Sequence, residues 1–287
     1  MINYVVYDVF TDTAFGGNQL AVIPDASALP EGDLQKIARE FNFSETTFVF
    51  PATEPAHTAK VRIFTPTMEI PFAGHPTIGT AIALLELGHK GDMVLELGIG
   101  PIPCSFDGKT ASFTISAALE QIAQPDIGVV AAALGLTPEQ ISTTTHTPVQ
   151  ASLGLPFVIV ELTDNKTLTA ATPSIDIIRQ GAAKYPAGAD FAIYAYTREM
   201  DQINARMFAP LDNIPEDPAT GSAAATLTAL LTKISGTAQN LTIHQGVDMG
   251  RPSIIRAQTT TGTQVRVTIS GQAVRTMRGQ LCHNAPT

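Results

Sequence analysis

The stretch V-R-I-F-T-P, Val61–Pro66, returns 144 residues later as A-R-M-F-A-P, Ala205–Pro210. Five residues after each closing proline comes another proline, Pro71 in the first stretch and Pro215 in the second. A glycine and then a run of small residues typical of a buried helix follow in both places. A strand, a proline spacing, a glycine and a helix that recur in one order indicate two homologous halves. The halves are joined where the strand pattern lapses, at 118–125.

The repeated element also suggests a ligand site. It reads Ala73-Gly74-His75-Pro76-Thr77 in the first half and Ala219-Thr220-Gly221-Ser222-Ala223 in the second. We expect Gly74 and Gly221 to form tight turns, because glycine tolerates backbone conformations that other residues avoid. The first N–H groups of a helix have no partner within it, and the helix dipole adds positive charge there. Two such helix ends facing each other across a cleft can hold a carboxylate. For one element alone, a turn followed by a closely packed helix is the simpler interpretation; the repetition favours a ligand site.

Hydrophobic patterning predicts many strands and few helices, which is typical of an α+β fold. Strands are predicted at 4–10, 20–23, 47–50, 59–64, 93–97, 111–115, 157–162, 191–196, 205–208, 253–258 and 264–269. Helices are predicted at 30–41, 77–87, 126–134, 174–183 and 222–234.

Composition excludes several classes of partner. The chain has 287 residues, 44% of them hydrophobic and 15% charged, which is typical of a globular protein. A net charge of −9 argues against nucleic acid or an anionic membrane as a partner. The first residues are expected to form a strand and not a signal peptide, and no apolar run is long enough to span a membrane. Two cysteines without a pairing pattern fit a reducing, cytoplasmic location. The six histidines lack metal-ligand spacing, so no metal site is expected.

Glu45 lies in N-F-S-E-T-T-F-V-F, Asn42–Phe50, immediately before an apolar strand. A carboxylate at this place is either on the solvent side of a sheet or positioned for chemistry, and the residues alone leave both open. His75 follows the glycine of the first repeated element, and Asp217 comes just before the second. Ser222 follows Gly221, where it would cap the helix or touch a ligand.

Taken together, these motifs resemble the PhzF-like isomerase family of phenazine biosynthesis, from residue 1 to about 283. The motifs are Phe15-Gly16-Gly17-Asn18-Gln19-Leu20-Ala21-Val22, Asn42-Phe43-Ser44-Glu45-Thr46, Arg62–Pro66, Pro71–Thr77 and Glu216–Ala223.

The resemblance implies a fold similar to that of diaminopimelate epimerase, which is α+β. Two pseudo-symmetric domains would each form a β-barrel around a central helix, with the active site in the cleft between them. The first domain would comprise residues 1–118, completed by the C-terminal segment 272–287, and the second would comprise 119–271. The resemblance also implies a homodimer, with no metal and no organic cofactor.

The resemblance further implies a cofactor-independent isomerase that moves a proton on a small carboxylated substrate similar to dihydro-hydroxyanthranilate. Glu45 would be the general acid/base, a task that burial of a carboxyl group favours. Gly74 and Gly221 would donate backbone N–H groups to the substrate carboxylate. The residues implied to bind the substrate are Asn18, Gly74, His75, Asp217, Gly221 and Ser222.

Related racemases that use two opposed thiols are excluded by the sequence. Their cysteines would lie near Ala73 and near Pro218, whereas the cysteines here are Cys104 and Cys282. Two alternatives stay open: the same mechanism on an unrelated metabolite, and a small-molecule-binding or interaction protein of the same fold without turnover.

Overall fold

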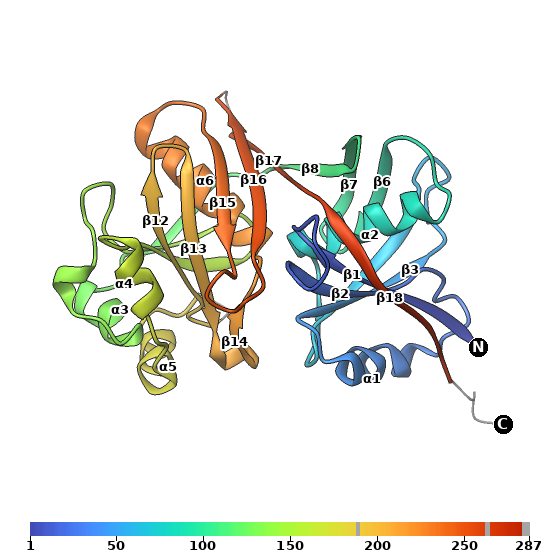
Figure 1. Cartoon of the computed structure of the whole chain (residues 1–287), viewed down its shortest axis with the longest axis horizontal. Coiled ribbons are helices and arrows are strands. Elements are labelled where there is room, and N and C mark those ends of the chain that lie inside the picture. Colours follow the sequence, from blue (N-terminus) through green and yellow to red (C-terminus); the bar gives the residue numbers. More distant parts are fainter. Residues whose placement is uncertain (188–189, 262–264, 283–287) are drawn as a thin grey trace. The chain divides into compact units, whose positions relative to one another are not determined.

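The computed structural model describes residues 1–187, 190–261 and 265–282 of the chain. It consists of two compact units, Met1–Thr114 with Ser270–Thr287, and Ile115–Ile269 (Figure 1). We call them unit 1 and unit 2. The predicted domain division, at 118/119 and 271/272, stays a prediction, because compactness does not show that either unit folds alone.

Unit 1 is built from three β-hairpins joined by parallel pairings. Strands β1 and β2, β3 and β4, and β6 and β7 pair antiparallel, whereas β2 pairs with β3 and β4 with β6 in parallel. The C-terminal strand β18 pairs antiparallel with β1, from Ile2 opposite Leu281 to Val9 opposite Ala273. The strands are β1 (Ile2–Val9), β2 (Asn18–Ile23), β3 (Glu45–Phe50), β4 (Ala59–Phe64), β5 (Glu69–Ile70), β6 (Met93–Leu97), β7 (Gly100–Asp107), β8 (Thr110–Ser116) and β18 (Ala273–Leu281).

Unit 2 repeats this order of pairings. Strands β10 and β11, β12 and β13, and β15 and β16 pair antiparallel, whereas β11 pairs with β12 and β13 with β15 in parallel. Strand β9 lies beside β10 as β18 lies beside β1. The strands are β9 (Glu120–Ala123), β10 (Val149–Ser152), β11 (Pro156–Glu161), β12 (Ile193–Glu199), β13 (Gln202–Ala209), β14 (Ile214–Asp217), β15 (Asn240–Gln245), β16 (Ser253–Thr260) and β17 (Arg266–Gly271). The duplication predicted from the sequence is thus visible in the strand register.

Each unit contains a buried helix of small residues: α2 (Gly74–Glu86) in unit 1 and α6 (Gly221–Ser235) in unit 2 (Figure 1). Small side chains let these helices pack closely on the strands. At Gly79, an added Cβ would come within 2.5 Å of the Leu20 side chain and 2.7 Å of that of Val9. A larger residue at position 79 would push α2 away from β1 and from β2, whose first residue is Asn18.

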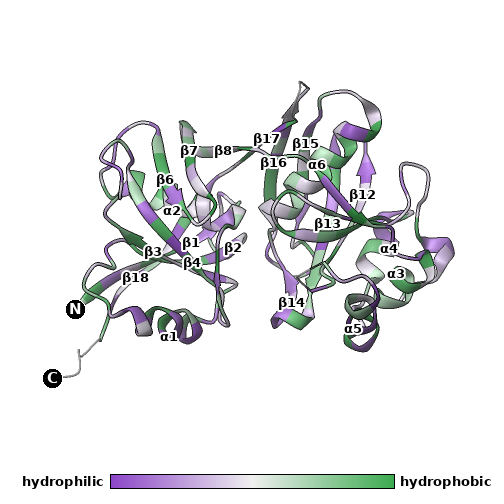
Figure 2. Cartoon of the chain, turned by 180° about the vertical axis from the view of Figure 1, so that it is seen from behind, coloured by the Kyte–Doolittle hydropathy of each residue, from purple (hydrophilic) through white to green (hydrophobic). Residues whose placement is uncertain are grey.

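The other helices lie at the periphery of their units. Helix α1 (Glu31–Phe41) is amphipathic, and Figure 2 shows hydrophilic and hydrophobic residues alternating along it. It packs Leu34 and Ala38 into the core of unit 1. In unit 2, α3 (Ile127–Ala133), α4 (Asn165–Ala170) and α5 (Ile175–Lys184) contribute to a second apolar core with residues of β11 and β12.

The structure corrects several local predictions. The first central helix begins at Gly74, three residues before the predicted start, because Pro76 is tolerated in a first helical turn. Gly74 and Gly221 are the first residues of their helices and do not have positive φ, so the expected tight turn at each glycine is wrong. Helix α4 and strands β5, β7, β9, β10, β14, β15 and β18 were not predicted. Strands β5, β9, β10 and β14 have four residues or fewer, and β7 contains Pro101 and Pro103. The first residue of the predicted strand 264–269 lies outside the described ranges, and so does the part of the segment 272–287 that follows residue 282.

Candidate active site

In unit 1, the structure brings Glu45 and His75 together. Glu45 is the first residue of β3, opposite Leu20 of β2, and His75 is the second residue of α2. The Oε2 atom of Glu45 lies 3.4 Å from Nδ1 of His75, and the two side chains are only 13% and 4% exposed. A carboxyl group and an imidazole are therefore held close together where little of either side chain is exposed to solvent. Of the two interpretations of Glu45, the solvent-exposed one is wrong.

His75 is neutral at ordinary pH. Burial lowers the pKa of its imidazole to about 3, against which a hydrogen bond with the Gln19 backbone acts only in part. The contact between His75 and Glu45 is consequently not an ion pair. A charged imidazolium would favour the ionised carboxylate, whereas a neutral ring can accept a hydrogen bond from the protonated carboxyl. This surrounding suits a carboxyl group that has to hold a proton as well as release it.

Asn18 and Ser44 extend the group. The Asn18 side-chain amide lies 3.3 Å from Nδ1 of His75, and the Ser44 hydroxyl donates to Oδ1 of Asn18 at 3.4 Å. Asn18 is the first residue of β2 and is buried. Three of the residues implied by the resemblance, Asn18, Glu45 and His75, are thus neighbours. Ser44 was quoted only as part of a motif, and its contact with Asn18 depends on the three-dimensional fold.

The first N–H groups of the two central helices have no side-chain cap and no partner within their helix. Neither has a side-chain cap: the residues before them, Ala73 and Thr220, make no capping hydrogen bond. The first main-chain bonds are those of Thr77 to Ala73 and of Ala224 to Thr220. The N–H groups of Gly74 and His75, and of Gly221 and its next two neighbours, therefore have no partner within their helix. Pro76 has no N–H, so α6 offers one donor more than α2.

In unit 2, Asp217 and Ser222 lie at the start of α6. Asp217 ends β14 and is buried, and its Oδ2 accepts a hydrogen bond of 2.6 Å from the hydroxyl of Thr220. Ser222 is the second residue of α6, the place that His75 holds in α2. The predicted residues Asp217, Gly221 and Ser222 thus form a second group. Gln245 was not among the predicted site residues, because no sequence motif marks it. Its side-chain amide donates to the Asp217 carbonyl oxygen and to the Thr220 hydroxyl.

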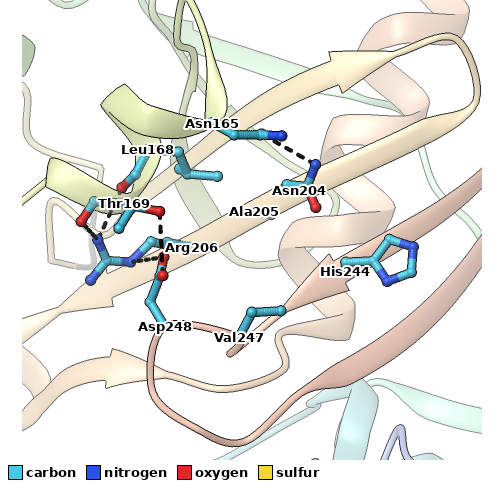
Figure 3. Close-up of a pocket in the computed structure, with 9 residues that line it drawn as sticks. All are labelled: Asn165, Leu168, Thr169, Asn204, Ala205, Arg206, His244, Val247 and Asp248. Atoms are coloured by element: carbon cyan, nitrogen blue, oxygen red, sulfur yellow. Dashed lines mark hydrogen bonds and ion pairs between the residues drawn. The ribbon is translucent and has the colours of Figure 1, made fainter.

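A small pocket of about 180 Å³ lies elsewhere in unit 2, between α4, β13, β15 and the residues after β15 (Figure 3). Its buried Arg206 does not make it an anion site. Nε and Nη2 of that side chain bind the Glu216 carboxylate at 2.8 Å each, and Nη1 donates to the carbonyls of Leu168, Thr169 and Ala171. Arg206 therefore ties α4 to β14, the strand that ends at Asp217.

Neither a metal cluster nor a reactive thiol accompanies these groups. In the described part of the chain, no three His, Cys, Asp or Glu side chains are grouped so as to hold a metal ion. Cys104 is buried, which raises the pKa of its thiol to about 12, and Cys282 is exposed. Across the described ranges, no helix combines the length and apolar character needed to cross a membrane.

Comparison with known proteins places the chain among isomerases. A family model described as phenazine biosynthesis-like protein, PhzC-PhzF, matches residues 7–279. An uncharacterized isomerase of Mesorhizobium japonicum is 37% identical, over 97% of this chain and 98% of its own. The trans-2,3-dihydro-3-hydroxyanthranilate isomerase of Pseudomonas fluorescens is 35% identical, over 98% of this chain and 99% of its own.

Solved structures show the same fold. A PhzF family protein of Bacillus anthracis superposes with a TM-score of 0.88 at 23% identity, covering 98% of this chain and 99% of its own. A hydroxyproline epimerase from Agrobacterium vitis superposes with a TM-score of 0.64 at 13% identity, over 97% of this chain and 91% of its own. The predicted α+β fold of the diaminopimelate epimerase type is confirmed. The chain belongs to the phenazine biosynthesis-like (PhzC-PhzF) protein family and is an isomerase of that family.

Proposed function

We propose that this protein is a cofactor-independent isomerase that moves a proton on a small carboxylated substrate similar to trans-2,3-dihydro-3-hydroxyanthranilate. Glu45 would act as the general acid/base, taking a hydrogen from one ring carbon and returning it to another; the product then tautomerises to a ketone. The names of relatives at 35% identity support the substrate class. The observation that carries the proposal is the buried contact between Glu45 and a neutral His75.

The duplication supports a single acid/base residue. Phe64 and Phe208 hold the same place in the repeated stretch, and their cross-strand partners are Thr46 and Ile193. The residue before Thr46 is Glu45, whereas the residue before Ile193 is Ala192. Only one of the equivalent positions can therefore exchange a proton. A mechanism with two opposed bases at these places is not available to this chain.

The remaining predicted residues would hold the substrate. Backbone N–H groups at the starts of α2 and α6 suit its carboxylate, since helix N-termini favour anions. The polar side chains at the two helix starts would orient its amino and hydroxyl groups. The residues in these roles are Asn18, Gly74, His75, Asp217, Gly221 and Ser222. We also propose a homodimer and a cytoplasmic location, the latter because neither cysteine is paired.

A second substrate class is compatible with the name of one relative. The Mesorhizobium japonicum relative is 37% identical and is named an isomerase without a substrate. The same proton shift on another small carboxylated metabolite therefore stays a candidate.

The test uses ¹H NMR of the purified protein with trans-2,3-dihydro-3-hydroxyanthranilate. Disappearance of the substrate signals and appearance of the isomer support the first substrate class. Saturable binding without conversion supports the second, and other carboxylated metabolites then become the substrates to try. If the protein neither binds nor converts this compound, the proposal that it is the type of substrate is contradicted.

A further inference from the structure

The side-chain amide of Gln245 is fully buried at the start of α6 and has four hydrogen-bond partners. Its Nε2 donates to the carbonyl oxygen of Asp217 at 2.8 Å and to Oγ1 of Thr220 at 2.9 Å. Its Oε1 accepts from the backbone N–H of Thr220 and from the hydroxyl of Tyr194, both at 3.2 Å. Gln245 is the last residue of β15 and is 0% exposed. The amide thus connects β15 and β12 to the turn before α6.

The chemistry of these partners fixes the direction of each bond. A backbone N–H only donates and a backbone carbonyl only accepts, so the Gln245 amide has one possible orientation. Its Nε2 donates to the Thr220 hydroxyl oxygen, which leaves the hydroxyl proton for Oδ2 of Asp217, 2.6 Å away. The hydrogen-bond chain from Tyr194 through Gln245 and Thr220 therefore ends on the carboxylate of Asp217. A carboxylate that accepts such a bond is held in one rotamer.

Thr220 is the N-cap residue of α6, yet it does not cap the helix. At this position a threonine hydroxyl usually accepts a hydrogen bond from a backbone N–H of the first turn. Here its proton goes to Asp217 and its lone pair receives the Gln245 amide. The Thr220 hydroxyl therefore binds the carboxylate of Asp217 and caps none of the N–H groups of α6. A residue kept only for the stability of the helix would make the capping bond.

Unit 1 shows that the fold does not require this network. Ile63 and Met207 are equivalent in the repeated stretch; the partners of Ile63 are Thr47 and Ile70, and those of Met207 are Tyr194 and Asp217. Unit 1 therefore has an apolar Ile70 at the place of Asp217.

The same holds for Gln245 and Thr220. Gln245 pairs with Ala205 in β13. The residue of unit 1 equivalent to Ala205 in the repeated stretch is Val61. Lys60 pairs with Glu96, so the next residues along the two strands, Val61 and Leu97, are neighbours, and Leu97 is equivalent to Gln245. The N-cap of α2, equivalent to Thr220, is Ala73. Isoleucine, alanine and leucine thus suffice to build this corner of the fold.

Both units have a close backbone contact at this place, but only unit 2 has the side-chain amide of Gln245. After Gln245, Gly246 has φ +72°, and a Cβ there would lie 2.7 Å from the Pro218 carbonyl oxygen. After Leu97, a Cβ on Gly98 would lie 2.7 Å from Cα of Pro71. In both units a glycine lets the strand end pack against the turn that precedes the central helix. The polar network is an addition found in unit 2, where Asp217 lies.

We propose that Gln245 and Thr220 are positioning residues that hold the carboxylate of Asp217 for the substrate's amino or hydroxyl group. This rests on the proposed function, in which Asp217 binds the substrate. Gln245 acts through Thr220, which alone of the two contacts the carboxylate, and neither need touch the substrate. Tyr194 completes the chain by fixing the Gln245 oxygen.

The kinetic test compares two variants of Thr220. Thr220→Val keeps the shape of the side chain and removes the hydroxyl, and Thr220→Ser keeps the hydroxyl. We expect Thr220→Val to raise KM about tenfold or more, as for a lost hydrogen bond to a charged group, with a smaller effect on kcat. Thr220→Ser should restore KM to near the wild-type value. Equal KM and kcat in wild type and Thr220→Val would overturn the proposal.

Gln245→Leu places in unit 2 the residue that unit 1 has at this position. We expect a folded protein with KM raised as in Thr220→Val. The double variant should be no worse than either single one, because both break one chain of bonds. If Gln245→Leu does not fold, the Thr220 pair still decides the question. Additive losses in the double variant would contradict a shared chain.

A readout without substrate separates this proposal from the proposed function. The ¹³C resonance of the Asp217 carboxyl, titrated with pH, should move to a higher midpoint in Thr220→Val and stay unchanged in Thr220→Ser. Arg206, Glu216 and Tyr194, the other titratable groups nearby, are the same in both variants. If wild type fails to convert the substrate but this difference appears, the proposed function fails and the positioning role stands. Identical midpoints in all three proteins would overturn the positioning role.

Discussion

The Oε2 atom of Glu45 lies 3.4 Å from Nδ1 of a buried, neutral His75, where the beginning of β3 meets the beginning of α2. A neutral ring can accept a hydrogen bond from the protonated carboxyl group, and little of either side chain is exposed to solvent. The side-chain amide of Asn18 lies 3.3 Å from the same Nδ1 atom. The pair therefore joins two separate stretches of the sequence in one proton-exchanging unit, on which the proposed function depends.

The start of α6 should contribute to substrate affinity through Ser222. We expect Ser222→Ala to weaken binding about fivefold to tenfold, the effect of about 1 kcal/mol for one ordinary hydrogen bond, and to leave the exchange step intact. Titration calorimetry with the substrate measures the change. Ser116→Ala, an exposed serine at the end of β8, is the matched control and should bind as wild type does. Unchanged binding in Ser222→Ala would remove this residue from the site.

Burial of a neutral His75 should make the protein less stable in acid. The pKa of this residue is lowered to about 3 in the folded state, against 6.5 for an ordinary histidine, so the unfolded chain takes up the proton first. Its contribution to stability is therefore complete above pH 6.5 and is lost as the pH falls toward 3. The limiting slope is about 1.4 kcal/mol per pH unit.

Urea unfolding at pH 7 and pH 5 tests this. The fall in unfolding free energy between the two pH values should be smaller for His75→Gln than for wild type, because glutamine does not titrate. His89→Gln, at an exposed position, is the control and should follow wild type. The same pH dependence in His75→Gln and wild type would show that His75 is not the titrating group.

The two equivalent arginines of the repeat should differ in their effect on stability. Arg206 is 9% exposed and binds Glu216 and three carbonyls, so Arg206→Met leaves the Glu216 side chain, which is 16% exposed, without its partner. We expect a loss of about 3–5 kcal/mol in unfolding free energy. Arg62 stacks on a phenylalanine as Arg206 does, but its partners Glu31 and Glu69 are 75% and 42% exposed. Arg62→Met should cost about 0–1 kcal/mol. Equal losses in denaturant unfolding would contradict this account of unit 2.

The cysteines should play no part in the reaction. Burial raises the pKa of Cys104 to about 12, so its thiol is not ionised at neutral pH, whereas Cys282 is exposed. A thiol reagent such as dithionitrobenzoate should modify one cysteine in the native protein and both after unfolding. The native Cys282→Ser variant should not react with the thiol reagent. The double variant Cys104→Ala/Cys282→Ser should retain proton exchange, and its loss of activity would restore a thiol mechanism.

Much of the fold could be predicted because the two halves still resemble each other in sequence. The stretch 61–66 and its counterpart 205–210 are β4 and β13, with equivalent partners in the two units. The helix starts were harder to predict, because glycine suggests a turn and Pro76 a break. In the structure Gly74 is already helical and Pro76 lies in the first turn. Strand β15 was not predicted, although its residues alternate as in a half-buried strand, because only Leu241 and Ile243 of its six residues are apolar.

The candidate site could be predicted only where motifs mark it. Glu45, His75 and Asp217 are quoted in motifs, but their surroundings depend on contacts between distant residues. The parallel pairing of β2 and β3, which places Glu45 opposite Leu20, is not visible in the sequence around Glu45 or His75. Gln245 has no motif, and its role follows from four hydrogen bonds that span 51 residues at most. Its place becomes evident only when β15 is compared with β6.

The most direct measurement for the central claim is ¹H and ²H NMR of the substrate in deuterated water, with wild type and with Glu45→Gln at matched concentrations. Wild type should isomerise trans-2,3-dihydro-3-hydroxyanthranilate and place solvent deuterium in the product. Glu45→Gln keeps the shape of the side chain but cannot relay a proton, so it should bind the substrate with nearly unchanged affinity and give neither isomerisation nor deuterium incorporation. Isomerisation by Glu45→Gln at the wild-type rate would contradict the assignment of Glu45 as the acid/base, and so would equal loss of binding and turnover, which would mark Glu45 as a ligand-holding residue.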